Sequence, residues 1–483
     1  MKNSGLRTAP ASACELHAAY AAGTLTPTQA TEHCLQAACE SPSVFTRITA
    51  ERALEEARQS TQRWRTGRPL GPLDGVPISW KDLFDVRGTP TTAASALLRS
   101  APPAPADAPV VARAAAAGMV CLGKTNLSEF AYSGLGLNPG FGTPANPRLG
   151  GRARAPGGSS SGAALAVVQG CGPLAMGTDT AGSVRIPAAF NGLVGFRASR
   201  GRYPMQGVFA LSPSLDTLGP LALGVADCMA LDQVLRSTVP AGDAAAGPAV
   251  PGPAVPGPAI GLQGQVFVID PGLLDDDRVQ AQVRDAIAAG LALLQRQGAR
   301  VQRRRLQSLD TVQTLTQRHG WLGAHEALAT HRERLDAPEQ AARMDPRVRS
   351  RLEAARHLDH GGYLQLLARR QPLMALFAQE LGGATLVLPT VGHPAPLLQP
   401  LLEDDALFAQ TNLATLRLTM PGSFLDAPAV ALPCGALCLQ GPGASAERLP
   451  IGLQLMRPQG DDDRLLRIAL AVEQALSSLN RSQ

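Results

Sequence analysis

The chain has 483 residues, of which 45% are hydrophobic and 17% charged, so it can bury a substantial core and is neither disordered nor fibrous. Its 44 basic and 39 acidic side chains give a net charge of +5, and aromatic residues make up only 4%. This balance argues against a nucleic-acid-binding platform. No apolar run approaches the roughly 18 residues of a membrane span, so no membrane partner is expected either.

Cysteine usage and the N-terminus bear on compartment and metal binding. Eight cysteines lie between Cys14 and Cys438 without a repeated short spacing, and the first ten residues lack an apolar signal core. These features predict reduced thiols and a cytoplasmic protein. The pair Cys434 and Cys438 has no further ligands nearby, and His325-Glu326 with His331 misses the spacing of a zinc helix. We expect no metal ion and no cofactor.

The first half of the chain divides into two patterns. Residues 1–70 are predicted to be a helical segment packed on the core, with capping-box starts at Ser12 and Thr26 and a third helix from about Ala50. Residues 71–235 change to short apolar runs separated by glycine, proline and small polar residues. That pattern is typical of a mixed α/β core.

The second half begins with a low-complexity stretch. Residues 236–262 repeat proline, glycine and alanine without a helical or strand period, which predicts a surface linker. Residues 263–483 are then expected to be the second half of the same domain, with a helical region at about 306–378 and a closing helix from about Asp462. Strands are predicted at 265–269, 385–389, 429–433 and 452–456. The whole chain is therefore predicted to be a single large α/β domain with a mixed central sheet flanked by helices.

Two loops of small residues carry the candidate nucleophiles. Three consecutive serines follow Gly158, more than a helix cap needs, and Ser183 lies in a second run from Gly177 to Arg185. Successive backbone N–H groups in such a run can face one concavity, which binds an anion such as a developing oxyanion. Each loop alone is equally compatible with a cap or a tight turn.

Lysine usage singles out Lys81. Only Lys2, Lys81 and Lys124 are lysine, so the other 41 basic side chains (44 minus 3) are arginine. An internal lysine retained in such a chain is a candidate for a nitrogen that can lose its proton. Lys81 follows an apolar, strand-like run, and burial can lower a lysine pKa by about 3 units, or roughly 4 kcal/mol. The competing interpretation is an ordinary ion pair with Asp82 or Asp85.

Two other segments match known motifs in residue identity, but their surrounding sequence does not suit the corresponding sites. Gly158 to Gly162 fits the nucleophile elbow with Ser160 as nucleophile, but no strand precedes it, and the chain has no histidine between His33 and His319. A histidine-dependent esterase using His393 is kept as a minor alternative. Residues 118–125 fit the P-loop pattern, yet their apolar centre predicts a buried strand.

Taken together, these segments resemble the amidase signature family. Lys81, the Gly157-to-Ser160 loop and the Asp179-to-Arg185 loop occur in the family's order and spacing, and the likeness resumes at 432–435 and 449–454. The resemblance implies the family's fold and a serine hydrolase reaction. It also implies a role for each matching residue: Ser183 as nucleophile, Ser159 as a bridging serine on a cis peptide bond, Lys81 as base, the backbone N–H groups of Thr180, Ala181, Gly182 and Ser183 as the oxyanion hole, and Asp179, Ser160 and Arg185 as braces of the loops.

The resemblance also limits which substrates and partners are expected. The loop of Phe130, Ala131 and Tyr132 is expected to line the acyl side of the site, although both aromatic rings are equally compatible with the core. Leu416 stands where amidotransferase subunits of the family place an aspartate, so a stand-alone amidase is expected. Two alternatives remain: a carbamate or urea-derivative hydrolase (allophanate- or biuret-like), or an amidotransferase A-type subunit. The expected partner is a small-molecule amide, and a homodimer is left open.

Overall fold

The computed structural model describes residues 11–236, 260–440 and 446–481. Within these ranges, eleven strands form one mixed sheet in the order β1-β3-β2-β4-β6-β5-β10-β11-β9-β7-β8. The pairs β2–β3, β2–β4, β7–β8 and β7–β9 are parallel, and the remaining pairs are antiparallel. The strands are β1 (Phe45–Ile48), β2 (Pro77–Lys81), β3 (Val120–Thr125), β4 (Leu174–Asp179), β5 (Val194–Arg197), β6 (Thr217–Ala222), β7 (Val266–Ile269), β8 (Arg300–Arg303), β9 (Thr385–Pro389), β10 (Ala429–Gln440) and β11 (Ala446–Met456).

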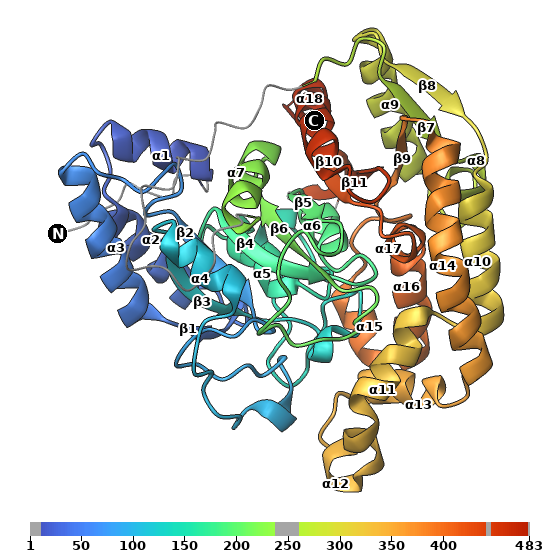
Figure 1. Ribbon diagram of the computed structural model, residues 1–483, viewed down its shortest axis with the longest axis horizontal. Coiled ribbons are helices and arrows are strands. Elements are labelled where there is room, and N and C mark those ends of the chain that lie inside the picture. Colours follow the sequence, from blue (N-terminus) through green and yellow to red (C-terminus); the bar gives the residue numbers. More distant parts are fainter. Residues whose placement is uncertain (1–10, 237–259, 441–445, 482–483) are drawn as a thin grey trace.

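Helices cover the sheet and extend past one end of it, as Figure 1 shows. The hydrophobic core lies between these layers, and strands of both halves of the chain contribute to it. The predicted α/β fold with a mixed central sheet is confirmed. The helices are α1 (Ala13–Ala21), α2 (Pro27–Cys39), α3 (Ala50–Arg65), α4 (Pro109–Ala116), α5 (Ser161–Val168), α6 (Arg185–Asn191), α7 (Val225–Leu235), α8 (Pro271–Leu274), α9 (Ala281–Arg296), α10 (Gln307–His319), α11 (Leu322–Asp336), α12 (Pro338–Ala341), α13 (Pro346–Ala355), α14 (His360–Leu381), α15 (Leu398–Glu403), α16 (Asp405–Leu416), α17 (Met420–Phe424) and α18 (Asp462–Arg481).

The N-terminal segment forms by local rules that the sequence displays. Ser12 Oγ accepts from the Glu15 N–H at 3.1 Å, and the Glu15 carboxylate accepts from the Ser12 N–H at 2.7 Å, which closes a capping box at α1. Thr26 and Gln29 close a second box at α2. The sequence pattern predicts only helices here, and β1 is the difference. Its four residues are too few to show an alternation, and they are held by antiparallel pairing with β3.

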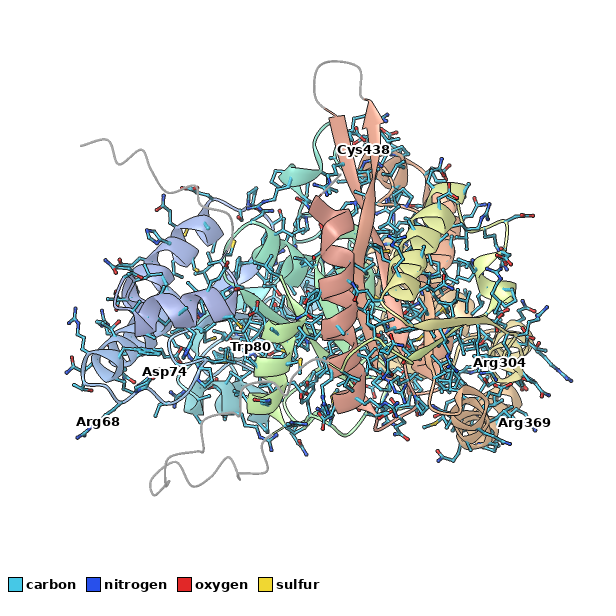
Figure 2. The ribbon with its side chains drawn as sticks, turned by 90° about the horizontal axis from the view of Figure 1, so that it is seen from above. Arg68, Asp74, Trp80, Arg304, Arg369 and Cys438 are labelled. Atoms are coloured by element: carbon cyan, nitrogen blue, oxygen red, sulfur yellow. The ribbon has the colours of Figure 1, made fainter. Side chains whose placement is uncertain are left out.

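Strands β2 and β3 build the buried centre of the first half. Every residue of both strands is buried, as the apolar runs predict for parallel strands covered on both faces. The P-loop-like residues Val120–Thr125 are strand β3, so they do not curl around a phosphate. Figure 2 places Trp80 of β2 inside the molecule and Arg304, next to β8, at its outer edge.

The second half adds the remaining strands and a helical arm. Strands β10 and β11 pair from Ala429↔Met456 to Gln440↔Ala446, well beyond the predicted 429–433 and 452–456. The predicted helical region at 306–378 corresponds to α10 through α14, which Figure 1 shows below β7 and β8, with α12 at the lower end of the view. Most of the predicted linker at 236–262 lies outside the described residues. In the part of the chain described, no helix has both the length and the apolar character needed to cross a bilayer.

Candidate active site

Lys81 is the last residue of β2 and is fully buried. Its Nζ lies 2.7 Å from Ser159 Oγ and 2.8 Å from Thr178 Oγ1. Burial lowers the pKa of the Lys81 ammonium to about 7, against the opposing effect of the nearby carboxylates of Asp216 and Asp179. Near neutral pH a large share of this amine therefore carries no proton.

Lys81 does not form an ion pair with Asp82, which was the competing interpretation of this lysine. Asp82 instead pairs with Lys124 of β3, whose Nζ lies 2.7 Å from Asp82 Oδ1. The same ammonium donates to the Pro90 carbonyl at 2.9 Å and to Thr91 Oγ1 at 2.8 Å. Three acceptors thus satisfy the three N–H bonds of Lys124. Lys124 is a structural cation, although it is as rare a residue in this chain as Lys81. The scarcity of lysine therefore does not by itself identify the base.

Ser159 precedes α5 in the first small-residue loop, and the Gly158–Ser159 peptide bond is cis. Its neighbour Ser160 donates its N–H to the Ser183 carbonyl at 3.2 Å, which brings the two predicted loops together. Gly177 lets the loops approach this closely, because a Cβ there would lie 2.7 Å from Ser160 Oγ. Residues that are far apart in the sequence therefore share one buried site.

Ser183 lies between β4 and α6, in a loop built around Asp179. Asp179 Oδ1 accepts from the Gly182 N–H at 2.8 Å and from Arg185 Nη2 at 2.9 Å, and its Oδ2 accepts from Arg185 Nε at 3.0 Å. Both members of this ion pair are fully buried. Burial alone would raise the pKa of Asp179, but Arg185 outweighs it and holds that pKa below its usual value. The carboxylate thus stays charged and fixes the turn that presents Ser183.

The four expected oxyanion donors are not equivalent. The Gly182 N–H is already engaged by Asp179, so this member of the predicted set differs from expectation. The N–H groups of Thr180, Ala181 and Ser183 have no hydrogen-bond partner within the described ranges. Thr419 donates its hydroxyl to the Ala181 carbonyl, which fixes the orientation of that peptide. Three free donors thus flank the candidate nucleophile, a set that suits a developing oxyanion.

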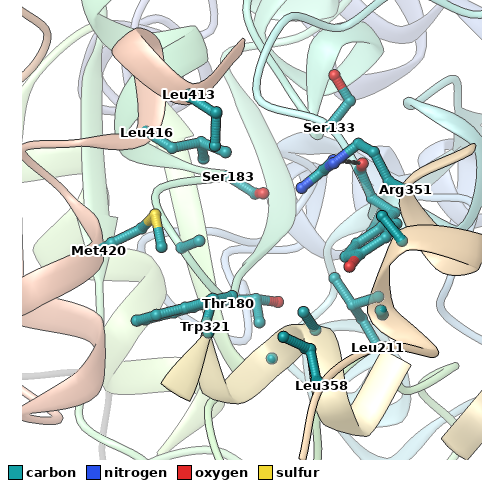
Figure 3. A pocket seen from close by; sticks show the side chains of 18 residues that line it. Ser133, Thr180, Ser183, Leu211, Trp321, Arg351, Leu358, Leu413, Leu416 and Met420 are labelled. Carbon is teal, nitrogen blue, oxygen red and sulfur yellow. Dashed lines mark hydrogen bonds between the residues drawn. The ribbon is translucent and has the colours of Figure 1, made fainter. Parts of the chain in front are cut away.

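A cavity of about 260 Å³ opens onto Ser183. Figure 3 shows the side chains that line it, with Ser183 and Thr180 on one wall and Arg351 of α13 opposite. The walls are mainly apolar, and Arg351 is the one charged side chain among the described lining residues. The apolar lining comprises Ala131, Tyr132, Ala181, Leu211, Gly320, Trp321, Gly323, Ala324, Ala354, Ala355, Leu358, Leu413, Leu416 and Met420.

The residues of the predicted substrate loop lie in two different environments. Ala131 and Tyr132 line the cavity, but Phe130 does not. The Phe130 ring is fully buried and packs on His331, with ring centroids 4.3 Å apart, and on Phe209 at 6.0 Å. Its side chain belongs to the core, one of the two interpretations that the sequence leaves open.

Three polar residues of the site have no role in the sequence-based prediction. Thr178 touches the Lys81 amine, and Asp216 accepts from the Thr180 hydroxyl at 2.6 Å. Arg351 comes from a helix of the second half. Thr178 lies in the small-residue run from Gly177 to Arg185, and the family likeness extends to residues 215–216, so the sequence offered a signal for Thr178 and for Asp216. Nothing in the sequence distinguishes Arg351 from the other arginines around it.

His393, the candidate of the esterase alternative, lies elsewhere in the hydrogen-bond network. Its Nε2 lies 3.1 Å from Thr415 Oγ1 and its Nδ1 lies 2.9 Å from the Pro394 carbonyl. Within the described residues, no serine bonds either ring nitrogen. A triad through His393 therefore has no geometric support.

Comparisons with known proteins identify the family of the chain. A sequence profile described as Amidase matches residues 28–466. The chain is 36% identical over 409 residues to a 2-amino-5-chloromuconic acid deaminase of Comamonas testosteroni, covering 84% of this chain and 83% of that protein. It is 31% identical over 495 residues to the A-type subunit of a glutamyl-tRNA(Gln) amidotransferase from Thermobifida fusca, covering 96% and 95%.

Solved structures give the same result. A crystal structure of an amidase matches with a TM-score of 0.80 and 32% identity, covering 96% of this chain and 100% of that one. A peptide amidase from Stenotrophomonas maltophilia matches with a TM-score of 0.74 and 26% identity, covering 96% and 97%. The chain is therefore an amidohydrolase and belongs to the amidase signature family.

Proposed function

We propose that the chain hydrolyses the amide bond of a small molecule through an acyl-enzyme, with Ser183 as nucleophile, Ser159 as proton relay and Lys81 as base. The observation that carries this proposal is the contact of Lys81 Nζ with Ser159 Oγ at 2.7 Å, in a fully buried site where the lysine pKa falls to about 7. A poised base of this kind suits general-base catalysis at neutral pH.

In the first step, neutral Lys81 accepts the hydroxyl proton of Ser159. Ser159 takes the proton of Ser183 as the Ser183 oxygen attacks the carbonyl carbon of the substrate. The carbonyl electrons move onto oxygen, and the resulting oxyanion accepts hydrogen bonds from the free N–H groups of Thr180, Ala181 and Ser183. Both protons move between side chains of the site, so this step exchanges no proton with water.

In the second step, the proton path runs in reverse. Lys81, now an ammonium, returns a proton through Ser159 to the leaving nitrogen, the C–N bond breaks, and ammonia or an amine departs from the Ser183 acyl ester. A water molecule, deprotonated by the same pair, then hydrolyses the ester and regenerates Ser183. The net reaction is amide plus water giving a carboxylate and an amine. Asp179, Arg185 and Ser160 keep the two loops in register during both steps.

The cavity supports a small substrate. Its volume of about 260 Å³ falls near the lower end of the few hundred to about 1,000 Å³ that ligand pockets usually occupy. The eight cysteines are free thiols, which supports action in the cytoplasm. Leu416 in the cavity wall, where an amidotransferase subunit would carry an aspartate, supports a stand-alone enzyme.

A second candidate reaction is the hydrolytic deamination of an amino-substituted carboxylic acid. The relative from Comamonas testosteroni, 36% identical over most of both chains, is a 2-amino-5-chloromuconic acid deaminase. In such a reaction water replaces the amino group on a carbon of the acid and ammonia leaves, so the C–N bond that breaks is not an amide bond. An assay for ammonia detects this reaction and primary-amide hydrolysis alike, so the two are separated by the organic product.

The test compares the purified wild type with Ser183→Ala, Lys81→Ala and Ser161→Ala on a panel of amides, carbamates and ureas. The first two variants should lose amide turnover by about 10³-fold or more. Ser161→Ala is the matched control, because this buried serine has a hydroxyl without a partner in the described structure and should tolerate alanine. Activity close to wild type in Ser183→Ala would refute the proposal, and turnover only after adding partner subunits would favour an amidotransferase component.

A further inference from the structure

Thr419 is a threonine of the second half of the chain whose hydroxyl reaches the nucleophile loop. It lies between α16 and α17 and is fully buried. A threonine before a helix often caps it, but the Thr419 side chain makes no cap bond to α17. Its hydroxyl has one proton, and of the two carbonyls within reach, that of Ala181 is nearer than that of Leu416 at 3.0 Å. The proton is therefore donated to the loop that carries Ser183.

The peptide unit between Ala181 and Gly182 is held at both of its polar ends. Its carbonyl accepts from Thr419, and its N–H donates to Asp179 Oδ1 at 2.8 Å. The C=O and N–H of a trans peptide lie in one plane and point in opposite directions, so partners on both sides fix the rotation of that plane. The peptide units that carry the Ala181 and Ser183 N–H groups adjoin it. A fixed plane therefore limits how far either free donor can turn.

The Thr419 contact closes a ring of hydrogen bonds around the loop. Arg185 Nη1 donates to the Thr419 carbonyl at 3.2 Å, and Nε of the same side chain donates to Asp179 Oδ2 at 3.0 Å. Asp179 also accepts from the Gly182 N–H. The Ala181 carbonyl of the same peptide completes the ring at the Thr419 hydroxyl. Apart from Ala181, the residues of this ring are buried, so the loss of one member leaves its neighbours without a partner.

Thr419 is itself supported by the sheet. Gln454 of β11 donates from Nε2 to the Leu418 carbonyl at 2.9 Å and accepts at Oε1 from Arg185 Nη1 at 3.0 Å. The Thr419 carbonyl also accepts from the Ser423 N–H at 3.2 Å. The threonine is thus held by the second half of the chain as well as by the loop. It can therefore act as a fixed support for the peptide that it contacts.

Gly182 allows the threonine to come this close. Its φ is +130°, and a Cβ at this position would lie 2.3 Å from Thr419 Oγ1 and 2.7 Å from Ile186 Cδ1. A side chain here would force the hydroxyl away from the Ala181 carbonyl. The glycine and the threonine therefore form one close contact between the two halves of the chain.

We propose that Thr419 is a positioning residue of the oxyanion hole, which fixes the peptide between Ala181 and Gly182 so that the Ala181 and Ser183 N–H groups meet the oxyanion as it forms. This inference rests on the proposed function of Ser183. Donors that are set in place before the reaction need no reorganisation when the charge develops. Thr419 does not line the cavity, so the loss of its hydroxyl should lower kcat and leave substrate binding nearly unchanged.

Two pairs of proteins isolate the hydroxyl. Thr419→Val keeps the shape of threonine without its hydroxyl, and Thr419→Ser differs from Thr419→Ala by the same group. On the amide that the wild type cleaves fastest, kcat should fall about 10- to 100-fold within each pair, with KM changed by no more than about twofold. Thr390→Val is the matched control, because Thr390 is fully buried and its hydroxyl has no partner within the described residues. It should keep the kcat of the wild type.

An inhibitor that forms the oxyanion distinguishes this role from one in folding. When 2,2,2-trifluoroacetophenone binds, the Ser183 oxygen bonds to the ketone carbon and the carbonyl electrons move onto oxygen. The Ser183 proton passes to Ser159, whose own proton passes to Lys81. Acetophenone has the same ring but is too weak an electrophile to add. Thr419→Val should raise the inhibition constant of the trifluoro ketone by the factor lost in kcat and leave that of acetophenone unchanged. Partial unfolding would change the number of binding sites and neither constant.

The outcomes separate this inference from the proposed reaction. Unchanged kcat in Thr419→Val and Thr419→Ala, or equal losses of affinity for the two ketones, would overturn the role of Thr419 and leave Ser183 as nucleophile. Amide turnover by Ser183→Ala, or inhibition by the trifluoro ketone that is unaffected by Ser183→Ala, would instead remove the proposed function itself. If Thr419→Val does not fold, the comparison of Thr419→Ser with Thr419→Ala decides alone.

Discussion

Replacing Lys81 by arginine tests the central requirement of the proposed mechanism, a nitrogen that can be uncharged. Arginine keeps a long cationic side chain at the end of β2, but its guanidinium stays protonated at any pH that the protein survives. Lys81→Arg should therefore lose activity to the same extent as Lys81→Ala. A residue needed only for its positive charge would tolerate the exchange much better.

The magnitude follows from the pKa of the buried amine. Burial lowers it from 10.5 to about 7, a difference of about 3.5 units, or about 5 kcal/mol at 1.36 kcal/mol per unit. At pH 7 about half of the Lys81 side chains are then neutral, compared with about one in 3,000 for a lysine of unperturbed pKa. The environment alone therefore makes the base about 10³ times more available, which sets the scale of the loss expected from arginine.

The assay is the pH dependence of kcat/KM on a neutral amide, which avoids titration of the substrate. Lys81 must be neutral, so activity should fall about tenfold per pH unit below pH 7 and level off above it. Lys81→Arg should remain below about one thousandth of wild type across the whole range. A wild-type profile that keeps rising to pH 10, or more than a tenth of wild-type activity in Lys81→Arg, would refute the role of a neutral amine.

Other consequences concern the groups around this lysine. Asp216→Asn removes a charge that holds the Lys81 pKa up, so the acid limb of the pH profile should move to lower pH by about half a unit to one unit; an unmoved limb would exclude the coupling. Lys124→Met leaves Asp82 buried without its cation and should lower the free energy of unfolding by about 3–5 kcal/mol, measured by chemical denaturation. Between pH 7 and about pH 10 the unfolded state holds the Lys81 proton and the folded state does not, so this group makes the free energy of unfolding rise by about 1.4 kcal/mol per pH unit. In Lys81→Met that increment should be absent, and equal pH slopes for the two proteins would contradict the low pKa.

The fold was predictable where local patterns were strong. The capping boxes at Ser12 and Thr26 and the buried apolar runs of β2 and β3 each fix an element by short-range chemistry. Strand β1 is the counterexample, because its four residues carry little pattern and depend on pairing with β3. The lengths of β10 and β11 depend likewise on pairing with each other, which a single strand's sequence does not display.

The residues of the site likewise fall into those with a local sequence signal and those whose role depends on the fold. Lys81, Ser159 and Ser183 could be proposed because each lies in a segment with unusual composition, and the family likeness joined those segments. The role of Gly182 was not predictable, since its N–H points to Asp179 or to the cavity according to the turn geometry alone. Arg351 was hidden for a different reason. One arginine among 41 becomes distinctive only when the fold places it in an apolar cavity without a carboxylate.

The low pKa of Lys81 raises a physical question, because acidic residues surround it. Asp82 is its direct neighbour in the sequence, and Asp179 and Asp216 are close enough to raise its pKa. An unengaged carboxylate in contact with a buried lysine would stabilise the ammonium and restore an ordinary ion pair. A neutral amine at this place therefore requires that each of these acids be engaged elsewhere.

The structure meets this requirement acid by acid. Asp82 is paired with Lys124 at 2.7 Å, on the neighbouring strand. Asp179 is paired with Arg185 at 2.9 Å. Asp216 has no cation, but it accepts the Thr180 hydroxyl and the backbone N–H groups of residues 211 and 212, and burial raises its own pKa. Lys81 is left with two hydroxyl partners and no contacting carboxylate, and an amine held between hydroxyls can accept a proton as well as donate one. The buried ion pairs around the site thus keep the base neutral by occupying the carboxylates that would otherwise charge it.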